Sequence, residues 1–140
     1  MEDRYLFKAK RLDNGEWITG SLITCEDGTC KIATSCLEGK ADEPILVGAY
    51  DVDRDTICQC TGLKDKNGKL IWENDIIECK DRKHNFQTQI EWDAYCAGFI
   101  FQDTETSAVG LDTITANGLY SESKVIGNIF DNPELVESEK

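Results

Sequence analysis

The chain has 140 residues, of which 40% are hydrophobic and 30% charged, so it has room for one domain or two small lobes and is not a disordered protein. Its 15 basic and 27 acidic residues give a net charge of −12, which argues against binding nucleic acid mainly through phosphates. No apolar run approaches the roughly 18 residues of a membrane helix, and the polar residues 1–4 do not resemble a signal peptide.

The N-terminal third is predicted to contain short antiparallel strands. Residues 5–10 and 16–23 flank a hairpin turn at Asn14-Gly15, and Asp27-Gly28 leads into a third strand at 29–33. The polar segment from Glu38 to Pro44 is expected to form a loop or linker.

The stretch 61–77 predicts a sharp corner in the chain. A strand at 53–60 would pair with Leu70–Trp72 through a two-residue type I′ turn at Asn67-Gly68. Asn74 can take a left-handed conformation, and a second strand resumes after it. Two close reversals of this kind fold a sheet back on itself, as in small barrels. The residues expected to shape the corner are Thr61, Gly62, Asn67, Gly68, Glu73, Asn74 and Asp75. Glu73 and Asp75 could form an acid pair, but hydrogen bonding to the turn backbone is favoured.

Residues 85–93 show the cleanest alternation in the chain, because Phe86, Thr88, Ile90 and Trp92 fall on one face. This pattern predicts a half-buried strand, with 98–101 as its partner. Residues 103–120 fit either a loop or a short helix.

The chain is predicted to end with a strand and a short helical turn. The strand covers residues 124–130. Asn132 would be the N-cap of the turn, with Pro133 at its first position and Glu134 in its first turn.

Three segments resemble the YopX family of phage and prophage proteins. Residues 8–20 are similar to the opening of its chains. Residues 56–77 resemble its pattern Thr-Gly-Leu-x-Asp-x-x-Gly, apolar pair, Glu-Gly-Asp, apolar pair, and residues 125–135 resemble its ending Val-Ile-Gly-Asn-Ile-x-x-Asn-Pro-Glu-Leu. The chain departs from the family at Asn74, where Gly is usual, and at 54–56, where Pro-Glu-Thr is frequent.

The resemblance implies a mostly β protein. Residues 1–53 would form a β-rich N-terminal lobe and residues 54–140 an SH3-type small barrel, with the short helical turn at its C-terminal end.

No catalytic or cofactor-binding motif is present, so the chain is predicted not to be an enzyme and to bind no cofactor. His84 is the single histidine, and its polar surroundings favour a solvated loop. Cys58 and Cys60, with Cys79, could supply three thiolates to zinc, but their spacing favours core packing and no metal site is expected. Seven cysteines without a Cys-x-x-Cys pair indicate free thiols in a cytoplasmic protein.

The predicted function is that of a protein-interaction or oligomerisation module in the bacterial cytoplasm. Small barrels expose edges and grooves that accept a partner, so the chain is expected to bind itself or another phage or host protein, and no membrane. Trp17, Trp72 and Trp92 are expected to pack in the core or at its rim.

The alternative is a nucleic-acid-binding small barrel that uses a basic hairpin. This hairpin consists of Lys80, Arg82, Lys83 and His84, with Phe86 beside them. Asp81 lies within it, and together with the acidic balance of the chain it favours a solvated hairpin tip. An acidic mimic of nucleic acid would instead require regular rows of carboxylates on one face.

Overall fold

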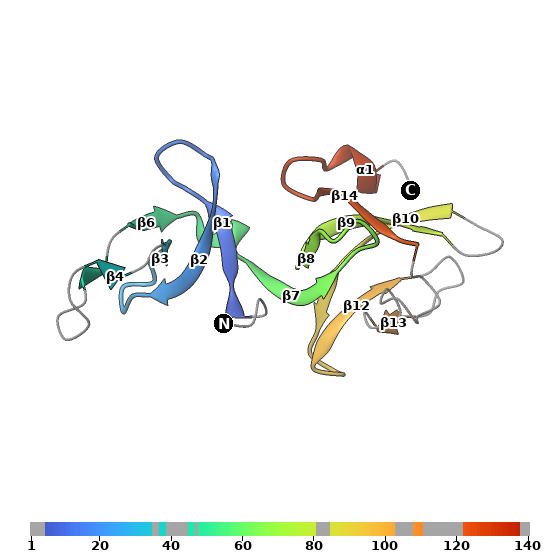
Figure 1. Cartoon of the computed structure of the whole chain (residues 1–140), viewed down its shortest axis with the longest axis horizontal. Helices are drawn as coiled ribbons and strands as arrows, with labels where there is room; N and C mark the ends of the chain where they lie inside the picture. Colours follow the sequence, from blue (N-terminus) through green and yellow to red (C-terminus); the bar gives the residue numbers. More distant parts are fainter. Residues whose placement is uncertain are drawn as a thin grey trace. The chain divides into compact units, whose positions relative to one another are not determined.

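The computed structural model describes residues 5–34, 37–38, 45–46, 48–80, 85–102, 108–110 and 122–137. They form several antiparallel sheets, which confirms the predicted mostly β fold (Figure 1). The chain divides into two compact units, Met1–Cys60 and Thr61–Lys140, each with its own hydrophobic core. The sequence-based boundary lies slightly earlier, between residues 53 and 54.

The first unit is built on one curved sheet. Its strands are β1 (Phe7–Lys10), β2 (Trp17–Thr24), β3 (Cys30–Ala33), β6 (Ala49–Val52) and the start of β7 (Cys58–Lys64). Their order is β6-β3-β2-β1-β7, with antiparallel neighbours throughout. The short strands β4 (Leu37–Glu38) and β5 (Ile45–Leu46) pair with each other. The 3-10 helix η2 (Arg54–Thr56) precedes β7, so the strand predicted at 53–60 begins only at Cys58.

Backbone hydrogen bonds join the edge strand β6 to the residues that follow β1. Arg11 forms an isolated bridge with Val52, and the Leu12 N–H donates to the Asp51 carbonyl at 3.1 Å. One bridge is not a continuous ladder, so the sheet is curled without closing into a barrel. Its inner face carries the first core, composed of Ala9, Cys30, Ile32 and Val52 packed against Phe7, Ile18, Leu22 and Ile57.

The turn at Asn67-Gly68 differs from the prediction. A type I′ turn needs positive φ at both central residues, yet the only described non-glycine residues with positive φ are Asn74 and Ala97. The Gly68 N–H donates to the Asp65 carbonyl at 3.0 Å, and the Asp65 N–H donates to the Lys69 carbonyl at 2.9 Å. Gly68 has a φ of +79°. The type I′ prediction is therefore wrong, and the loop has three residues with a left-handed glycine last.

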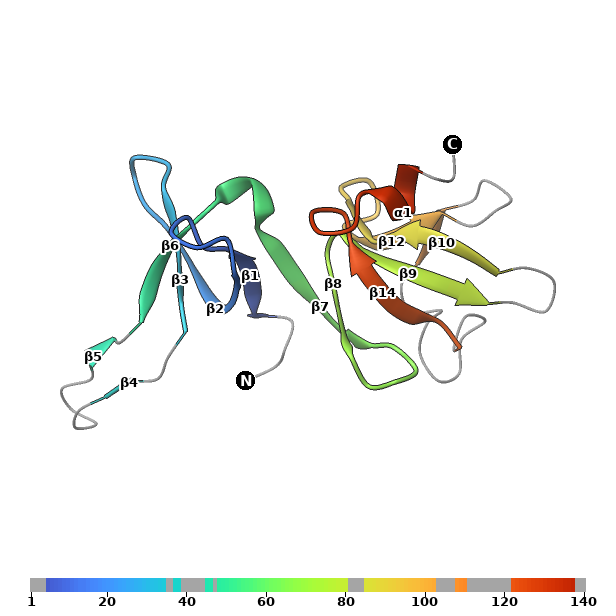
Figure 2. The same ribbon diagram turned by 90° about the horizontal axis from the view of Figure 1, so that it is seen from above.

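The second unit contains the end of β7, its partner β8 (Leu70–Trp72), and two three-stranded antiparallel sheets (Figure 2). The first sheet has the order β10-β9-β14, with β9 at Asp75–Lys80, β10 at Asn85–Gln89 and β14 at Lys124–Asn128. The second has the order β11-β12-β13, with β11 at Glu91–Asp93, β12 at Gly98–Gln102 and β13 at Ala108–Gly110.

Ile90 connects these two sheets. The segment 85–93, predicted as one strand, bends at Ile90, so β10 and β11 belong to different sheets. The Ile90 N–H donates to the Asp75 carbonyl, and the Ile90 carbonyl accepts from the Asn74 N–H, both at 2.8 Å. The single-strand prediction is wrong because the backbone of Ile90 pairs with the central corner. The predicted partnership with 98–101 is confirmed, since Trp92 pairs with Phe99.

The core of the second unit lies between its sheets. It consists of Ile71, Ile77, Cys79, Ile90 and Phe101, none of which is exposed, with Leu63, Phe86, Phe99, Val109 and Val125 packed against them. The described strands do not close into a barrel, so the predicted SH3-type barrel is not shown. The turn between β7 and β8 is joined to the residue before β14 by a hydrogen bond from the Lys66 N–H to the Ser123 carbonyl.

The described chain ends with α1 (Glu134–Glu137). Asn132 was predicted as a helix N-cap, but its side-chain oxygen accepts from the Asn128 N–H at 3.2 Å. Asn128 in turn accepts from the backbone of Phe130 and Asp131. In the part of the chain that is described, no helix has the length and apolar character needed to cross a membrane.

Candidate functional site

Two buried carboxylates hold the central corner. Asp65 is 7% exposed; its Oδ1 accepts from the N–H groups of Asn67 and Lys69, and its Oδ2 from the Val125 N–H, all at 2.9 Å. Asp75 is 2% exposed and its Oδ2 accepts from the Trp72 N–H at 2.8 Å. Backbone N–H groups donate hydrogen bonds to both carboxylates, so the role of Asp65 and Asp75 is structural. Sequence reasoning missed Asp65, although it stands in the family pattern.

The other predicted corner residues lie around these carboxylates. Asn74 has a φ of +70°, the left-handed conformation that its sequence context predicts, and its Oδ1 accepts from the Gln89 side chain at 3.1 Å. The Thr61 hydroxyl donates to the Ile71 carbonyl at 2.7 Å. Gly62 lies in β7 and Glu73 in the turn before β9. The residues that the sequence grouped therefore form the corner itself.

The predicted basic hairpin is only partly described, because Arg82, Lys83 and His84 lie outside the described residues. The Lys80 ammonium lies 3.8 Å from the Glu78 carboxylate. Phe86 packs against the second core, so its ring is not free to stack on a base. The two described members thus offer little to a nucleic acid.

The three cysteines considered for zinc are all fully buried. Cys58 and Cys60 lie on β7, whereas Cys79 lies on β9, which pairs with β10 and β14 rather than β7. Burial raises the pKa of the Cys79 thiol to about 11, with the Ser123 hydroxyl acting in the opposite direction. A thiol held protonated in an apolar core is a poor metal ligand. Among the described residues no group of three His, Cys, Asp or Glu is placed to hold a metal.

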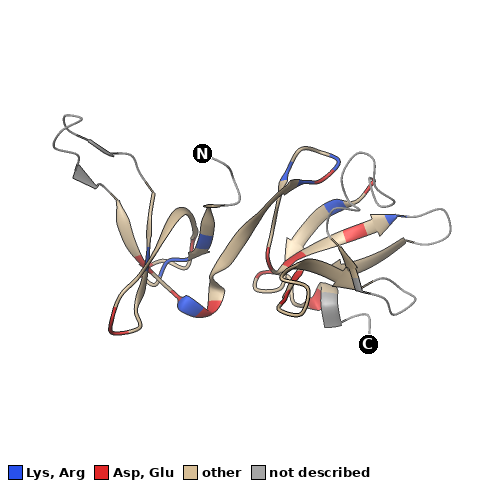
Figure 3. Ribbon diagram, turned by 90° about the horizontal axis from the view of Figure 1, so that it is seen from below, with Lys and Arg blue, Asp and Glu red and all other residues tan. Residues whose placement is uncertain are grey.

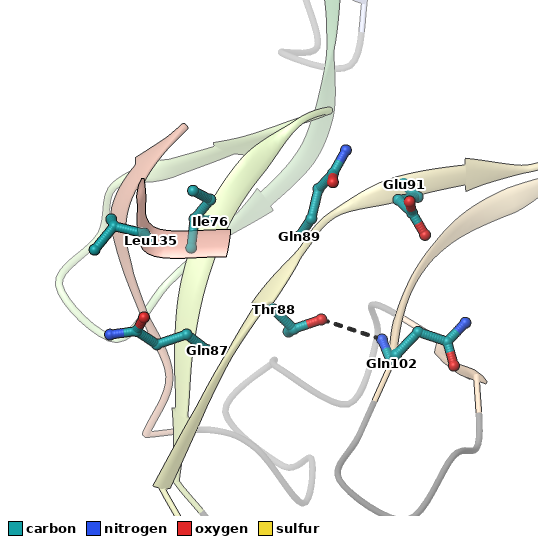
Figure 4. Close-up of a pocket in the computed structure, with 7 residues that line it drawn as sticks. All are labelled: Ile76, Gln87, Thr88, Gln89, Glu91, Gln102 and Leu135. Carbon is teal, nitrogen blue, oxygen red and sulfur yellow. Dashed lines mark hydrogen bonds between the residues drawn. The ribbon is translucent and has the colours of Figure 1, made fainter. Parts of the chain in front are cut away.

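A small polar pocket lies beside β10 in the second unit (Figure 4). It has a volume of about 180 Å³ and is lined by Ile76, Gln87, Thr88, Gln89, Glu91, Gln102 and Leu135. The Thr88 hydroxyl accepts from the Gln102 N–H at 3.3 Å. The lining offers amides, one hydroxyl and one carboxylate, without a His, Cys or cation. It can accept a small hydrogen-bonding group, but it is smaller than the roughly 300 Å³ of typical ligand sites.

Two cavities flank the exposed Leu12 in the first unit, with volumes of about 390 and 360 Å³. Two of their polar side chains are engaged with close neighbours. Asp51 pairs with the Lys31 ammonium at 2.8 Å, and the Thr29 hydroxyl donates to Asp27 at 2.6 Å. Both cavities therefore combine apolar surface from Leu12 with charged groups, and Arg54 also lines the cavity of about 390 Å³.

The hairpin of β11 and β12, residues 91–99, exposes large aromatic side chains, and we call it the aromatic hairpin. Tyr95 is 100% exposed at its tip, and Trp92 is 49% exposed. Trp92 meets the Phe99 ring edge to face, with centroids 5.2 Å apart. The other tryptophans differ, since Trp72 is buried and Trp17 lies under the Lys8 and Lys10 ammonium groups. The prediction of core or rim packing fits them better than it fits Trp92.

Three lysines lie at the end of β7 and in the turn that leads to β8, and we call this segment the lysine turn (Figure 3). They are Lys64, Lys66 and Lys69. All three side chains are exposed, and within the described chain none of them has an ion-pair partner. Asp65, the one acid of the turn, points inward to backbone N–H groups. The turn is therefore a locally basic surface on a protein with a net charge of −12.

Comparison with known proteins agrees with the sequence motifs. The family model described as "YopX protein" matches residues 6–137. The chain is similar to the crystal structure of protein EF1440 from Enterococcus faecalis, with a TM-score of 0.62, 25% identity, and coverage of 93% of this chain and 96% of that one. It is also similar to the crystal structure of protein yopX from Bacillus subtilis, with a TM-score of 0.55, 18% identity, and coverage of 94% and 98%.

At 18% identity, the second of these likenesses shows the fold alone. No curated protein matches the sequence. Because the family model spans almost the whole chain and its characteristic segments occur in the right order, the chain belongs to the YopX family.

Proposed function

We propose that this protein is a non-catalytic interaction module of phage or prophage origin, that it acts in the bacterial cytoplasm, and that its main partner is a second copy of itself. The observation that carries the proposal is the exposure of Tyr95 and Trp92 on the aromatic hairpin. Tyrosine and tryptophan are the residues most enriched in the energetic centres of protein interfaces. Another phage or host protein that covers the same hairpin would use the same side chains.

The placement of the acids and thiols supports a non-catalytic role. Asp65 and Asp75 are bound by backbone N–H groups, and Cys58, Cys60 and Cys79 are buried. Catalysis requires a nucleophile or base near a binding site. Among the described residues, the polar pocket beside β10 is lined by one carboxylate, that of Glu91, with no His, Cys, Lys or Arg to act with it.

The test compares the native mass of the wild-type protein with that of Trp92→Ala, Tyr95→Ala and the double variant, by light scattering coupled to size exclusion. The wild type is expected to give a multiple of the monomer mass, and the double variant to shift toward monomer. Leu12→Ala is the matched control, because Leu12 is an apolar side chain of the first unit with 67% exposure. A wild type that stays monomeric at about 100 μM, or a double variant with unchanged mass, would refute the proposal.

Nucleic-acid binding remains the alternative, through the hairpin of Lys80, Arg82, Lys83, His84 and Phe86. Lys80 lies near Glu78 and Phe86 packs on the core, so the described part of this hairpin favours the interaction module. Retention on heparin that fades steeply with added salt would favour the alternative.

We also propose that residues 54–140 complete an SH3-type small barrel. Support comes from the bend at Ile90 and from the bonds that join separate elements, including Val125 to Asp65 and Ile129 to Asn74. Such corners join the sheets of small barrels. Nuclear Overhauser contacts that run without a break around all strands of the unit would establish closure, and an open edge along β14 would refute it.

A further inference from the structure

We infer that the lysine turn of one copy binds the aromatic hairpin of another copy. The inference rests on the proposed self-association and identifies the surface that meets the aromatic side chains. It begins from charge: two copies that each carry −12 repel one another, and basic groups in their contact would offset part of this repulsion.

The lysine turn is suited to this contact. Lys64, Lys66 and Lys69 are exposed and have no ion-pair partner within the described chain, unlike Lys31 and Lys80. Asp65 would ordinarily reduce their charge at the surface. Its carboxylate is buried and accepts three backbone N–H groups, so the three ammonium groups dominate the outer side of the turn.

The aromatic hairpin complements the turn in two ways. Its β11 strand carries two acids beside Trp92 in the chain, on the opposite face of the strand. Glu91 is exposed, whereas the Asp93 carboxylate already accepts from the Tyr95 N–H at 2.9 Å. Ammonium groups bind both carboxylates and the faces of indole and phenol rings. The protein already uses the second type of contact, since the Lys8 ammonium lies 4.8 Å from the centre of the Trp17 ring.

The two surfaces do not meet within one copy. Tyr95 is fully exposed, and the lysines of the turn contact neither an acid nor a ring in the described structure. Each copy therefore offers both halves of the contact, and copies can join either reciprocally or head to tail into a closed ring. A nucleic acid is disfavoured as the occupant of the turn, because three lysines on a strongly acidic protein provide few phosphate contacts.

Two variants of the 140-residue chain test this contact. In the turn variant, Lys64→Glu, Lys66→Glu and Lys69→Glu reverse the lysine turn; in the hairpin variant, Glu91→Lys reverses one acid of the aromatic hairpin. Like charges then face each other in both variants, so each is expected to self-associate at least about tenfold more weakly than wild type by sedimentation. Mixing the two variants restores an opposite-charge pair at both contacts, so the mixture is expected to assemble. Circular dichroism confirms that each variant is folded, and Arg54→Glu serves as the control for an exposed cation elsewhere.

The hairpin variant also separates local from overall charge. Glu91→Lys makes the protein less negative, so overall repulsion alone would strengthen assembly, whereas the proposed contact predicts weaker assembly. If both charge variants assemble like wild type while Trp92→Ala/Tyr95→Ala prevents assembly, the proposed function stands and this inference fails. A monomeric wild type overturns both. If wild type binds a fluorescein-labelled 20-nucleotide DNA and the turn variant does not, the turn serves nucleic acid and the inference is wrong.

Discussion

Replacing Asp65 by Ala tests how the second unit is held together. The substitution removes the acceptor for the N–H groups of Asn67, Lys69 and Val125, each 2.9 Å away. The two turn N–H groups are open to water, so their loss should cost about 0.5–1 kcal/mol each, whereas the partly buried Val125 bond to a carboxylate should cost about 1.5–2 kcal/mol. We expect the free energy of unfolding to fall by about 3 kcal/mol. With a urea slope of about 1.5 kcal/mol/M, the midpoint should fall by about 2 M.

Asp27→Ala is the matched control for this experiment. Asp27 also accepts hydrogen bonds at a glycine turn, but only from the backbone and hydroxyl of Thr29, and it is exposed. Its loss should cost about 1 kcal/mol or less. Amide hydrogen exchange gives a local measurement. The exchange rate of the Val125 N–H should rise in Asp65→Ala and stay at the wild-type value in Asp27→Ala. Equal destabilisation by the two substitutions, or unchanged protection of Val125, would refute the role assigned to Asp65.

Two further predictions concern packing and ionisation. Gly20→Ala would place a Cβ against the Ala33 carbonyl oxygen, so the free energy of unfolding of the first unit should fall by at least about 3 kcal/mol, or the unit should fail to fold. Gly15→Ala meets no neighbouring atom, but Gly15 has a φ of +73°, so this substitution should cost about 1 kcal/mol in urea unfolding. The folded Cys79 thiol, with its pKa raised from 9.0 to about 11, keeps its proton while the unfolded thiol ionises, so stability should fall as pH rises from 9 to 11. Between pH 8 and 10.5, the free energy of unfolding of the wild type should fall by about 2 kcal/mol more than that of Cys79→Ala. If urea unfolding shows the same fall for both proteins, the raised pKa assigned to Cys79 is wrong.

The sequence predicts the elements better than it predicts their partners. The strand periodicities and the left-handed Asn74 could be inferred because they depend on local chemistry. The break at Ile90 could not, because the apolar alternation continues unchanged through it. What ends the strand is a pair of backbone bonds to Asn74 and Asp75, and these depend on how the corner is placed.

Local sequence patterns also fail to predict the exposure of the aromatic hairpin and the charge of the lysine turn. Trp92 shares its parity with Phe86 and Ile90, which predicts burial, but it lies beyond the bend and half of it is exposed. The sequence shows three lysines close together, but Asp65 lies among them, and this pattern suggests that its negative charge offsets theirs. Its inward orientation follows from a bond to Val125, 60 residues away, which no local pattern reveals.

The bend at Ile90 also constrains how the length of this chain can change during evolution. A single residue separates β10 from β11, and its N–H and carbonyl are both engaged. An insertion or deletion there would exchange the inner and outer faces of every position up to the next turn, so that Trp92 and its neighbours would swap sides. Homologues should therefore keep a constant number of residues from the start of β10 to the end of β11, on either side of Ile90, and vary in length at the connections that precede and follow this segment.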